Sequence, residues 1–315
     1  MGKIAFVFPG QGSQTVGMGN ELASKYESVR SFFQKADDRL GYSLSSIIFE
    51  GPKEELTLTT NAQPALLTTS IAILEYFKQT GIEPDFVAGH SLGEYTALVA
   101  AKALTFEDGV YAVRKRGEFM EEAVPNGEGT MAAVLGLDRD ALKQVTDAVT
   151  LEGNPVQLAN INCPGQIVIS GSRLGVEKAS QKAKEAGAKR ALPLEVSGPF
   201  HSSLMKPAAD KFREVLDHLP IEKAKIPVIS NVSAAEMSEP DEIKEKLIEQ
   251  LYSPVQWEDS IKKMIDLGVD TFIEIGPGKV LSGLIKKIDR SVKIYSVSDE
   301  ETFKSVVDAL KEDEK

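Results

Sequence analysis

The 315-residue chain has a single cysteine, Cys163, so an intrachain disulfide is excluded and an oxidising compartment is not indicated. We expect this cysteine to be structural, within its Pro-Gly turn. No apolar run approaches the roughly 20 residues that a membrane-spanning helix needs. The first residues lead directly into a strand pattern and lack the apolar region and cleavage site of a signal peptide. A soluble, cytoplasmic protein is therefore expected.

Positively charged residues are outnumbered by negatively charged ones. The net charge of −11 argues against nucleic acid and anionic membrane surfaces as general partners. Only three histidines are present and none clusters with cysteine, so neither a metal site nor a bound cofactor is expected. Gly10 and Gly12 are followed by Thr15, where a dinucleotide fingerprint needs glycine, and residues 276–279 lack the spacing of a P-loop.

What the chain does contain is a nucleophile-elbow motif, G-x-S-x-G, in the sequence Gly89-His90-Ser91-Leu92-Gly93. Residues 84–88 have the pattern of a short buried strand and residues 92–104 that of a buried apolar helix. A serine in the turn between them holds its hydroxyl out at the carboxyl edge of a sheet. We therefore predict that Ser91 is a nucleophile; a turn that serves only packing is the alternative.

The first 126 residues alternate between strand and helix patterns, which is typical of a mostly parallel sheet covered on both faces. Pro64 is expected in the first turn of a helix over 64–79. Thr105 and Asp108 form a capping-box pattern that opens a helix reaching about residue 123. The other elements expected here are a strand at 4–8 and helical stretches near 20–40.

A different order follows, βαββαβ, which is that of the ferredoxin-like unit. Its expected elements are strands at 130–137, 156–162, 166–172 and 190–196 and helices at 139–149 and 175–187. We place a small subdomain at 127–197, inserted into a discontinuous catalytic core of residues 1–126 and 198–315. In the second part of the core we expect helices at 203–219, 241–251 and 279–289, strands at 226–231, 271–275 and 293–297, and a frayed tail at 311–315.

A serine nucleophile needs a base within hydrogen-bond reach. His90 adjoins the serine and cannot easily reach across the turn, and His218 ends an amphipathic helix, where its positive charge suits the helix terminus. His201 lies in a loop between the inserted unit and the core, so by elimination it is the predicted base. No obvious buried acid on a strand-end loop lies between residues 92 and 200. A dyad would suffice if a backbone or side-chain carbonyl held the imidazole in the right tautomer.

The oxyanion of an acyl-transfer intermediate needs preorganised donors. The backbone N–H of Leu92 is one expected donor, and the loop that carries Gln11 is a candidate for the second, although it also fits a plain Gly-rich turn. In the helix that follows Thr105, Arg114 and Arg116 flank the apolar stripe while Lys115 points away from it. Either arginine suits a carboxylate clamp, with a solvated ion pair as the alternative.

Together these residues resemble the malonyl-CoA:acyl carrier protein transacylases. The similarity extends from residue 3 to about residue 300 and rests on several dispersed motifs in register. They are Phe8-Pro9-Gly10-Gln11-Gly12-Ser13-Gln14, Gln63-Pro64-Ala65, Gly89-His90-Ser91-Leu92-Gly93-Glu94, Arg116-Gly117, Gly198-Pro199-Phe200-His201, Asn231-Val232, Gln250-Leu251-Tyr252 and Glu274-Ile275-Gly276-Pro277-Gly278-Lys279.

The resemblance implies a hydrolase-like α/β core with a ferredoxin-like insertion, and it implies a role for each matched residue. Ser91 would carry the malonyl ester, and His201 would act as base and then as acid. Arg116, not Arg114, would bind the malonate carboxylate, in a site that also contains Gln63. Other implied roles are Phe200 as the residue before the histidine in enzymes that take malonyl, Gln250 as the main-chain carbonyl that holds His201, and the amides of Gln11 and Leu92 as the oxyanion hole.

The resemblance also implies malonyl-CoA and acyl carrier protein as partners, in fatty-acid biosynthesis or alternatively in polyketide synthesis. An acidic carrier needs basic residues on this acidic chain. The candidates are an insertion patch (Lys182, Lys184, Lys189 and Arg190) and a C-terminal patch (Lys286, Lys287 and Arg290). A monomer is expected. The competing functions are a serine esterase or thioesterase and an inactive module that only binds a carrier protein.

Overall fold

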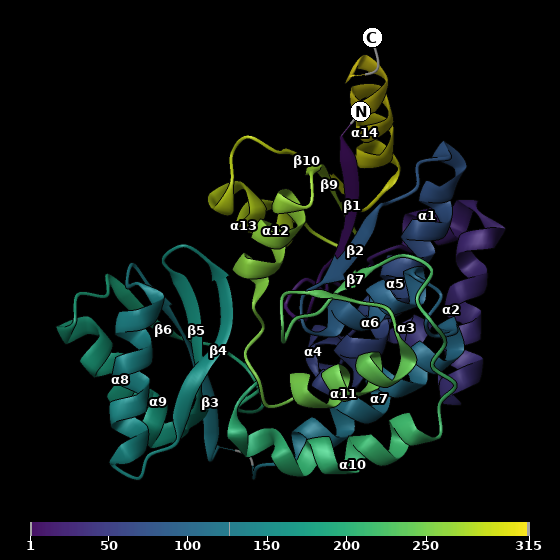
Figure 1. The fold of residues 1–315 in the computed structure, drawn as a ribbon. Coiled ribbons are helices and arrows are strands. Elements are labelled where there is room, and N and C mark those ends of the chain that lie inside the picture. Colours follow the sequence, from purple (N-terminus) through teal and green to yellow (C-terminus); the bar gives the residue numbers. More distant parts are fainter. Residues whose placement is uncertain (1, 126, 314–315) are drawn as a thin grey trace.

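A computed structural model describes residues 2–125 and 127–313. Its larger body is built on a six-stranded sheet of order β10-β9-β1-β2-β7-β8, in which only the β7–β8 pair is antiparallel (Figure 1). The chain is thus of the mixed α/β class with a mostly parallel sheet. The strands are β1 (Lys3–Phe8), β2 (Phe86–Gly89), β7 (Val228–Ile229), β8 (Glu236–Met237), β9 (Val269–Ile275) and β10 (Lys293–Val297).

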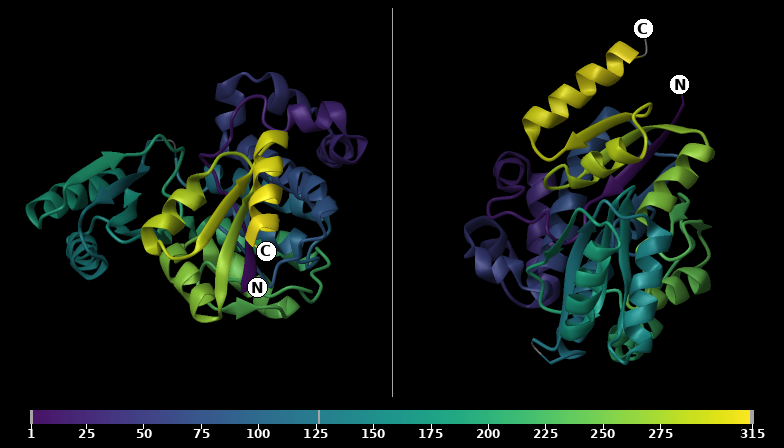
Figure 2. Two further views of the ribbon diagram at one scale, coloured as in Figure 1. Left: turned by 90° about the horizontal axis from the view of Figure 1, so that it is seen from above. Right: turned by 90° about the vertical axis from the view of Figure 1, so that its left-hand side faces the viewer.

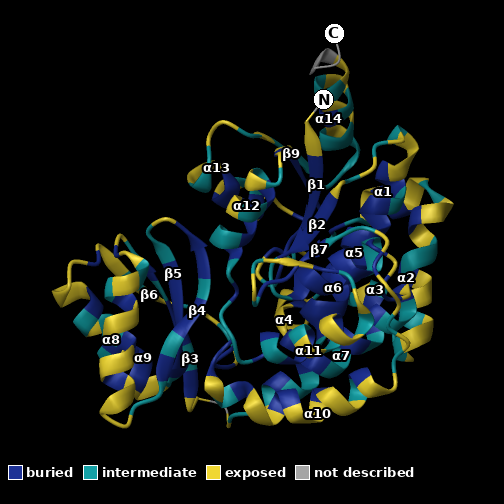
Figure 3. Cartoon of the chain, in the orientation of Figure 1, coloured by how far each residue is buried: buried dark blue, intermediate teal, exposed yellow. Residues whose placement is uncertain are grey.

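Both faces of this sheet are covered, and β1 shows why. Successive side chains of a strand point to opposite faces, and in β1 Phe6 and Phe8 enter one apolar cluster while Ala5 and Val7 enter another. Figure 3 shows that β1, β2 and β9 are buried along most of their length. The first cluster includes α2 (Glu27–Leu40), α5 (Thr59–Phe77), α6 (Leu92–Ala100), α7 (Phe106–Glu122), α10 (Lys206–Asp217) and α11 (Pro240–Gln250), and the second α12 (Trp257–Asp266) and α13 (Val280–Ile288).

The smaller unit stands to one side of the larger body (Figure 2). Its antiparallel sheet has the order β4-β5-β3-β6, and two helices cover one face of it. It has an apolar cluster of its own. The elements follow the order β3 (Gly129–Leu135), α8 (Arg139–Leu151), β4 (Val156–Cys163), β5 (Gln166–Ser172), α9 (Arg173–Glu185) and β6 (Arg190–Pro193), so the predicted βαββαβ order is present.

Pro64 is not in the first turn of its helix, as we predicted, because α5 begins at Thr59. A proline inside a helix leaves the carbonyl four residues earlier without its usual donor. Here that carbonyl belongs to Thr60, and it accepts a hydrogen bond of 3.0 Å from Nη1 of Arg114 on α7. A side chain about 50 positions away thus takes over the bond that the proline cannot make.

The C-terminal prediction was also wrong. The chain continues as α14 (Glu300–Asp313), so residues 311–313 are helical where we expected a frayed tail; residues 314 and 315 lie outside the described part. Phe303 packs against Tyr76 and Phe77, and Val306 is buried, so an apolar face holds the helix. The further elements are α1 (Asn20–Lys25), α3 (Leu44–Glu50), α4 (Lys53–Thr57), η1 (Lys78–Thr80) and η2 (Ser203–Met205). None of the described helices combines the length and apolarity needed to cross a membrane.

Candidate active site

Ser91 occupies the sharp turn between β2 and α6, with φ 52° and ψ −106°. A non-glycine residue in this region is strained, and such strain is typical of functional turns. The turn closes only because its flanking residues lack side chains. A Cβ at Gly89 would lie 1.9 Å from the carbonyl carbon of Gly93, and one at Gly93 would lie 2.1 Å from the Phe8 oxygen. The elbow geometry predicted from the motif is therefore present.

His201 contacts the Ser91 hydroxyl directly. Its Nε2 lies 2.8 Å from Ser91 Oγ, and its Nδ1 lies 2.8 Å from the main-chain carbonyl of Gln250. A carbonyl only accepts, so it fixes the proton on Nδ1 and leaves Nε2 free to accept the serine proton. The predicted serine–histidine pair and the carbonyl that orients it thus lie together. The loop that presents His201 follows β6 and also has a positive φ, 59°.

Arg116 is the arginine that faces the serine, although only 1% of it is exposed. Its Nη2 lies 3.1 Å from Ser91 Oγ and 2.9 Å from Oε1 of Gln250, while Nη1 lies 2.8 Å from Oε1 of Gln63. Two neutral amide oxygens therefore hold a buried guanidinium beside the hydroxyl. Arg114 instead donates hydrogen bonds to the Thr60 carbonyl and to Glu118. Arg116 is therefore the cation of the site.

A buried carboxylate behind this site escaped the sequence analysis. Glu94, on the first turn of α6, accepts hydrogen bonds from the Asn231 amide at 2.9 Å and from the Nε2 group of Gln250. Asn231 in turn accepts the Ser91 amide at 2.7 Å and donates to the Gly89 carbonyl at 2.7 Å. The only sequence signals were a Glu directly after the elbow and an Asn in a motif of the resemblance, and neither revealed this mutual contact.

The two amides expected to form an oxyanion hole have no hydrogen-bond acceptor among residues 2–125 and 127–313. They are the backbone N–H groups of Gln11, after β1, and of Leu92, at the start of α6. The Gln11 side chain donates to Thr59 Oγ1 at 3.2 Å, which ties its loop to α5. A cavity of about 170 Å³ joins the loop, the serine and both units; its lining includes Gln11, Ser91, Arg116, Met131, Asn160, Phe200 and His201.

Burial and charge set the protonation states of the site. Burial, reinforced by the Arg116 charge, lowers the pKa of His201 to about 3, so the imidazole is neutral at pH 7. Burial raises the pKa of Glu94 to about 7, against hydrogen bonds from Asn231 and Gln250 that favour the ionised form. Burial also lowers the pKa of Arg116. The base is therefore ready to accept a proton at neutral pH.

The other residues considered in the sequence make no contact with the Ser91 hydroxyl within the described part of the chain. His90 contacts Asn162 of the small unit at 2.8 Å, and His218 contacts the Glu214 carbonyl at the end of α10. Lys115, which points away from the apolar stripe as predicted, is about one-third exposed and pairs with Glu118. Cys163 is buried at the end of β4. In the two basic patches, Lys182 pairs with Glu152 and Lys287 donates to Gln166.

An elbow serine, a neutral histidine and free oxyanion donors define a site for acyl transfer, and comparison with known proteins gives the class. The family model of the acyl transferase domain matches residues 5–314. The chain belongs to this acyl transferase family.

Within it, the chain belongs with the malonyl CoA-acyl carrier protein transacylases. The protein of that name from Bacillus subtilis (strain 168) is 68% identical over 313 residues, which cover 99% of each chain. An acyl carrier protein S-malonyltransferase from Vibrio cholerae has a solved structure with a TM-score of 0.94 and 46% identity, covering 96% of this chain and 99% of that one. A malonyl-transacylase solved in complex with a type II PKS acyl-carrier protein has a TM-score of 0.95 and 42% identity, covering 98% and 99%.

Proposed function

We propose that this protein transfers the malonyl group from malonyl-CoA to the phosphopantetheine thiol of an acyl carrier protein in fatty-acid biosynthesis. The observation that carries the proposal is the Arg116 guanidinium, held 3.1 Å from the hydroxyl of Ser91. An acyl group that reaches the serine and bears a carboxylate meets a fixed cation there, while a neutral acyl group leaves that buried cation without a counter-ion.

The reaction has two matching halves. His201 takes the Ser91 proton on Nε2 as the hydroxyl oxygen attacks the thioester carbonyl, and the amides of Gln11 and Leu92 hold the resulting oxyanion. The carbon–sulfur bond then breaks, and CoA leaves as a thiol with the proton from His201. The carrier thiol enters, gives its proton to His201 and attacks the malonyl ester, and Ser91 is released with that proton. Ping-pong kinetics follow.

The gross organisation supports the same proposal. We assign residues 1–126 and 198–315 to a hydrolase-like core and residues 127–197 to a ferredoxin-like subdomain, on the basis of the strand orders described above. Residue 126 lies outside the described part. Met131 and Asn160 of the small unit line the serine cavity with Arg116 of the core, so the substrate lies between the two units. The expected cytoplasmic location and monomeric state stay predictions.

Intact-mass measurement after brief mixing with malonyl-CoA or acetyl-CoA tests the proposal on the wild type, Ser91→Ala and Arg116→Ala. We expect a malonyl adduct on the wild type, none on Ser91→Ala, and acetyl labelling that increases only in Arg116→Ala. Release of free malonate with no lasting adduct would identify a hydrolase instead. Carrier-protein binding with neither adduct nor turnover would identify a binding module.

A further inference from the structure

A second hollow, outside the active site, lies at the opposite edge of the parallel sheet. It has a volume of about 470 Å³, in the range of small-molecule pockets and larger than the 170 Å³ at the serine. Pro84 and Ile226 of its lining precede β2 and β7, whereas Ser91 follows the carboxyl end of β2. A ligand here would therefore not compete directly with an acyl group on the serine.

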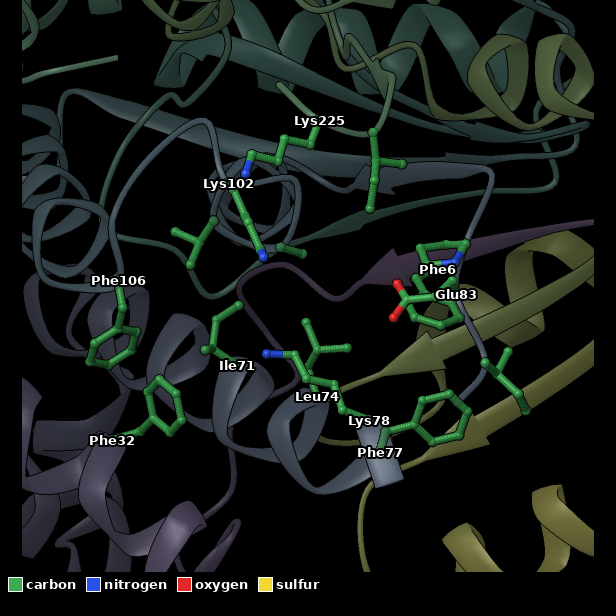
Figure 4. Close-up of a pocket in the computed structure, with 15 residues that line it drawn as sticks. Phe6, Phe32, Ile71, Leu74, Phe77, Lys78, Glu83, Lys102, Phe106 and Lys225 are labelled. Carbon is green, nitrogen blue, oxygen red and sulfur yellow. The ribbon is translucent and has the colours of Figure 1, made fainter. Parts of the chain in front are cut away.

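The walls of this cavity are hydrocarbon. Except for three lysines and one glutamate, every lining side chain is apolar, and Phe6, Ile71, Leu74 and Phe77 are nearly fully buried beneath it. Figure 4 shows these side chains around one open space. Polar rings and sugars would lose their hydrogen bonds to water on such a surface, whereas an alkyl chain would gain from burial.

The polar part of the lining is cationic. Lys78, Lys102 and Lys225 line the cavity with one carboxylate, Glu83 (Figure 4). Lys78 pairs with Glu75, but Lys102 and Lys225 have no ion-pair partner within the described residues. A hydrogen bond of 2.8 Å from the Lys225 amide to the Ala101 carbonyl places the backbone of Lys225 beside the residue that precedes Lys102. Lys102 and Lys225 outnumber Glu83, so this lining is net positive on a chain of net charge −11 and favours an anionic ligand.

Lys102 also stands in an unusual backbone position. It follows the C-terminus of α6 with φ 60°, a conformation in which helices commonly end on glycine. A lysine there is strained relative to glycine. The ammonium group of Lys102 points into the open space in Figure 4. Position 102 thus carries a lysine instead of the glycine that suits its backbone best, and this lysine places a cation at the cavity.

From these observations we propose that the cavity binds a fatty acid anion, with its alkyl chain on the apolar walls and its carboxylate at Lys102 and Lys225. This site is separate from the acyl-transfer site, and its occupancy does not depend on the proposed function. Other amphipathic molecules share the alkyl chain, but only an anionic head group matches the two free lysines.

Calorimetric titration of the full chain with laurate below its micelle concentration tests this inference, with dodecyltrimethylammonium as a cation of similar tail. We expect laurate to bind and the cation to bind at least about tenfold more weakly, as expected from charge-assisted contacts. Absence of laurate binding, or equal binding of the two amphiphiles, would overturn the proposal.

Two variants locate the site. Lys102→Gly combined with Lys225→Gln should weaken laurate binding by about tenfold or more. Glycine relieves the strain at φ 60°, so we do not expect the substitution of Lys102 to damage the fold. Lys184→Gln with Lys286→Gln removes the same charge from exposed sites outside the cavity and should leave binding unchanged. An equal effect of both pairs would mean that laurate binding depends only on the net charge of the protein. No effect of the first pair would mean that laurate binds outside this cavity.

Discussion

At the scale of single residues, the site keeps a neutral base beside a fixed cation. Arg116 and burial both lower the pKa of His201, to about 3. The imidazole therefore stays neutral over the whole neutral range, and its ordinary titration near pH 6.5 should not limit the reaction. The group that titrates near pH 7 is Glu94, whose pKa burial raises to about 7.

We therefore predict that kcat/KM for malonyl-CoA falls as the pH drops through about 7, because Glu94 becomes protonated while His201 stays neutral. Ionised Glu94 accepts from both Asn231 and Gln250, and a protonated carboxyl group has only one oxygen free of hydrogen. The pH profile of the free enzyme checks this. A limb that also persists in Glu94→Gln would belong to the substrate or to another group.

Glu94→Gln tests the same network directly. In the wild type, Asn231 and Gln250 donate to the two different oxygens of Glu94. Glutamine replaces one of these oxygens with an NH₂ group, so either the Asn231 amide or the Gln250 side chain must face a donor. We expect kcat/KM to fall by about tenfold to a hundredfold, as Gln250 loses its hold on Arg116. Steady-state kinetics with malonyl-CoA and acetyl-CoA measure this fall. An unchanged ratio of kcat/KM for malonyl-CoA to kcat/KM for acetyl-CoA would contradict the loss of the hold on Arg116.

The stability of Glu94→Gln, compared with that of the wild type, should increase as the pH rises. In the folded wild type the pKa of Glu94 lies above its unfolded value, so its contribution is fully present below pH 4.5 and is lost as the pH rises through about 7. Glu94→Gln removes this titration. Its free energy of unfolding relative to wild type should therefore improve between pH 5 and pH 8, as measured by urea denaturation.

At the scale of elements, the elbow depends on contact between two backbones. A Cβ at position 93 would lie 2.1 Å from the Phe8 oxygen, at the end of β1 and just before the loop of Gln11. Gly93→Ala should therefore destabilise the fold by about 1–3 kcal/mol and disturb one oxyanion donor. Gly283→Ala, within α13 and in open space, is the matched control and should stabilise by roughly 0.5–1 kcal/mol. Equal effects on denaturation and activity would refute the role of this contact.

Sequence reasoning was most successful where a short segment carries its own physical signal. The Thr105 cap is confirmed, since its hydroxyl accepts the Asp108 amide at 3.1 Å, and β5 and β10 have the predicted bounds. It failed where the deciding partner is distant in sequence. The start of α5 ahead of Pro64 depends on Arg114, and the order of α14 depends on Tyr76 and Phe77.

The same division holds for the site. The elbow and the approach of His201 to Ser91 were predictable from residue types and motif positions, whereas the choice of Arg116 over Arg114 came from the resemblance alone. The Glu94 network was not, since its members are separated by up to 156 positions and only the folded sheet brings them together. Local periodicity contains no information on such pairs.

At the scale of the whole molecule, the serine cavity opens between two units that several hydrogen bonds and an ion pair join. Arg139 of α8 binds Asp259 of α12 through two hydrogen bonds of 2.7 and 2.9 Å, and the Ile161 amide donates to the Val255 carbonyl. A carrier protein that delivers its thiol to Ser91 must approach this opening. Residues 194–196, directly after β6, line it.

The insertion patch on and beside β6 is therefore the better placed of the two basic patches. Its exposed residues Lys189 and Arg190 lead into the segment that lines the cavity, and electrostatic steering of an acidic carrier is strongest near the site of delivery. We predict that Lys189→Glu with Arg190→Glu raises KM for the carrier protein several-fold at low salt and leaves KM for malonyl-CoA unchanged. Lys286→Glu with Arg290→Glu is the matched control, because it reverses the same charge at the C-terminal patch. If only this control raises the carrier KM, docking takes place at that patch instead; if neither pair changes it, steering by both patches is refuted.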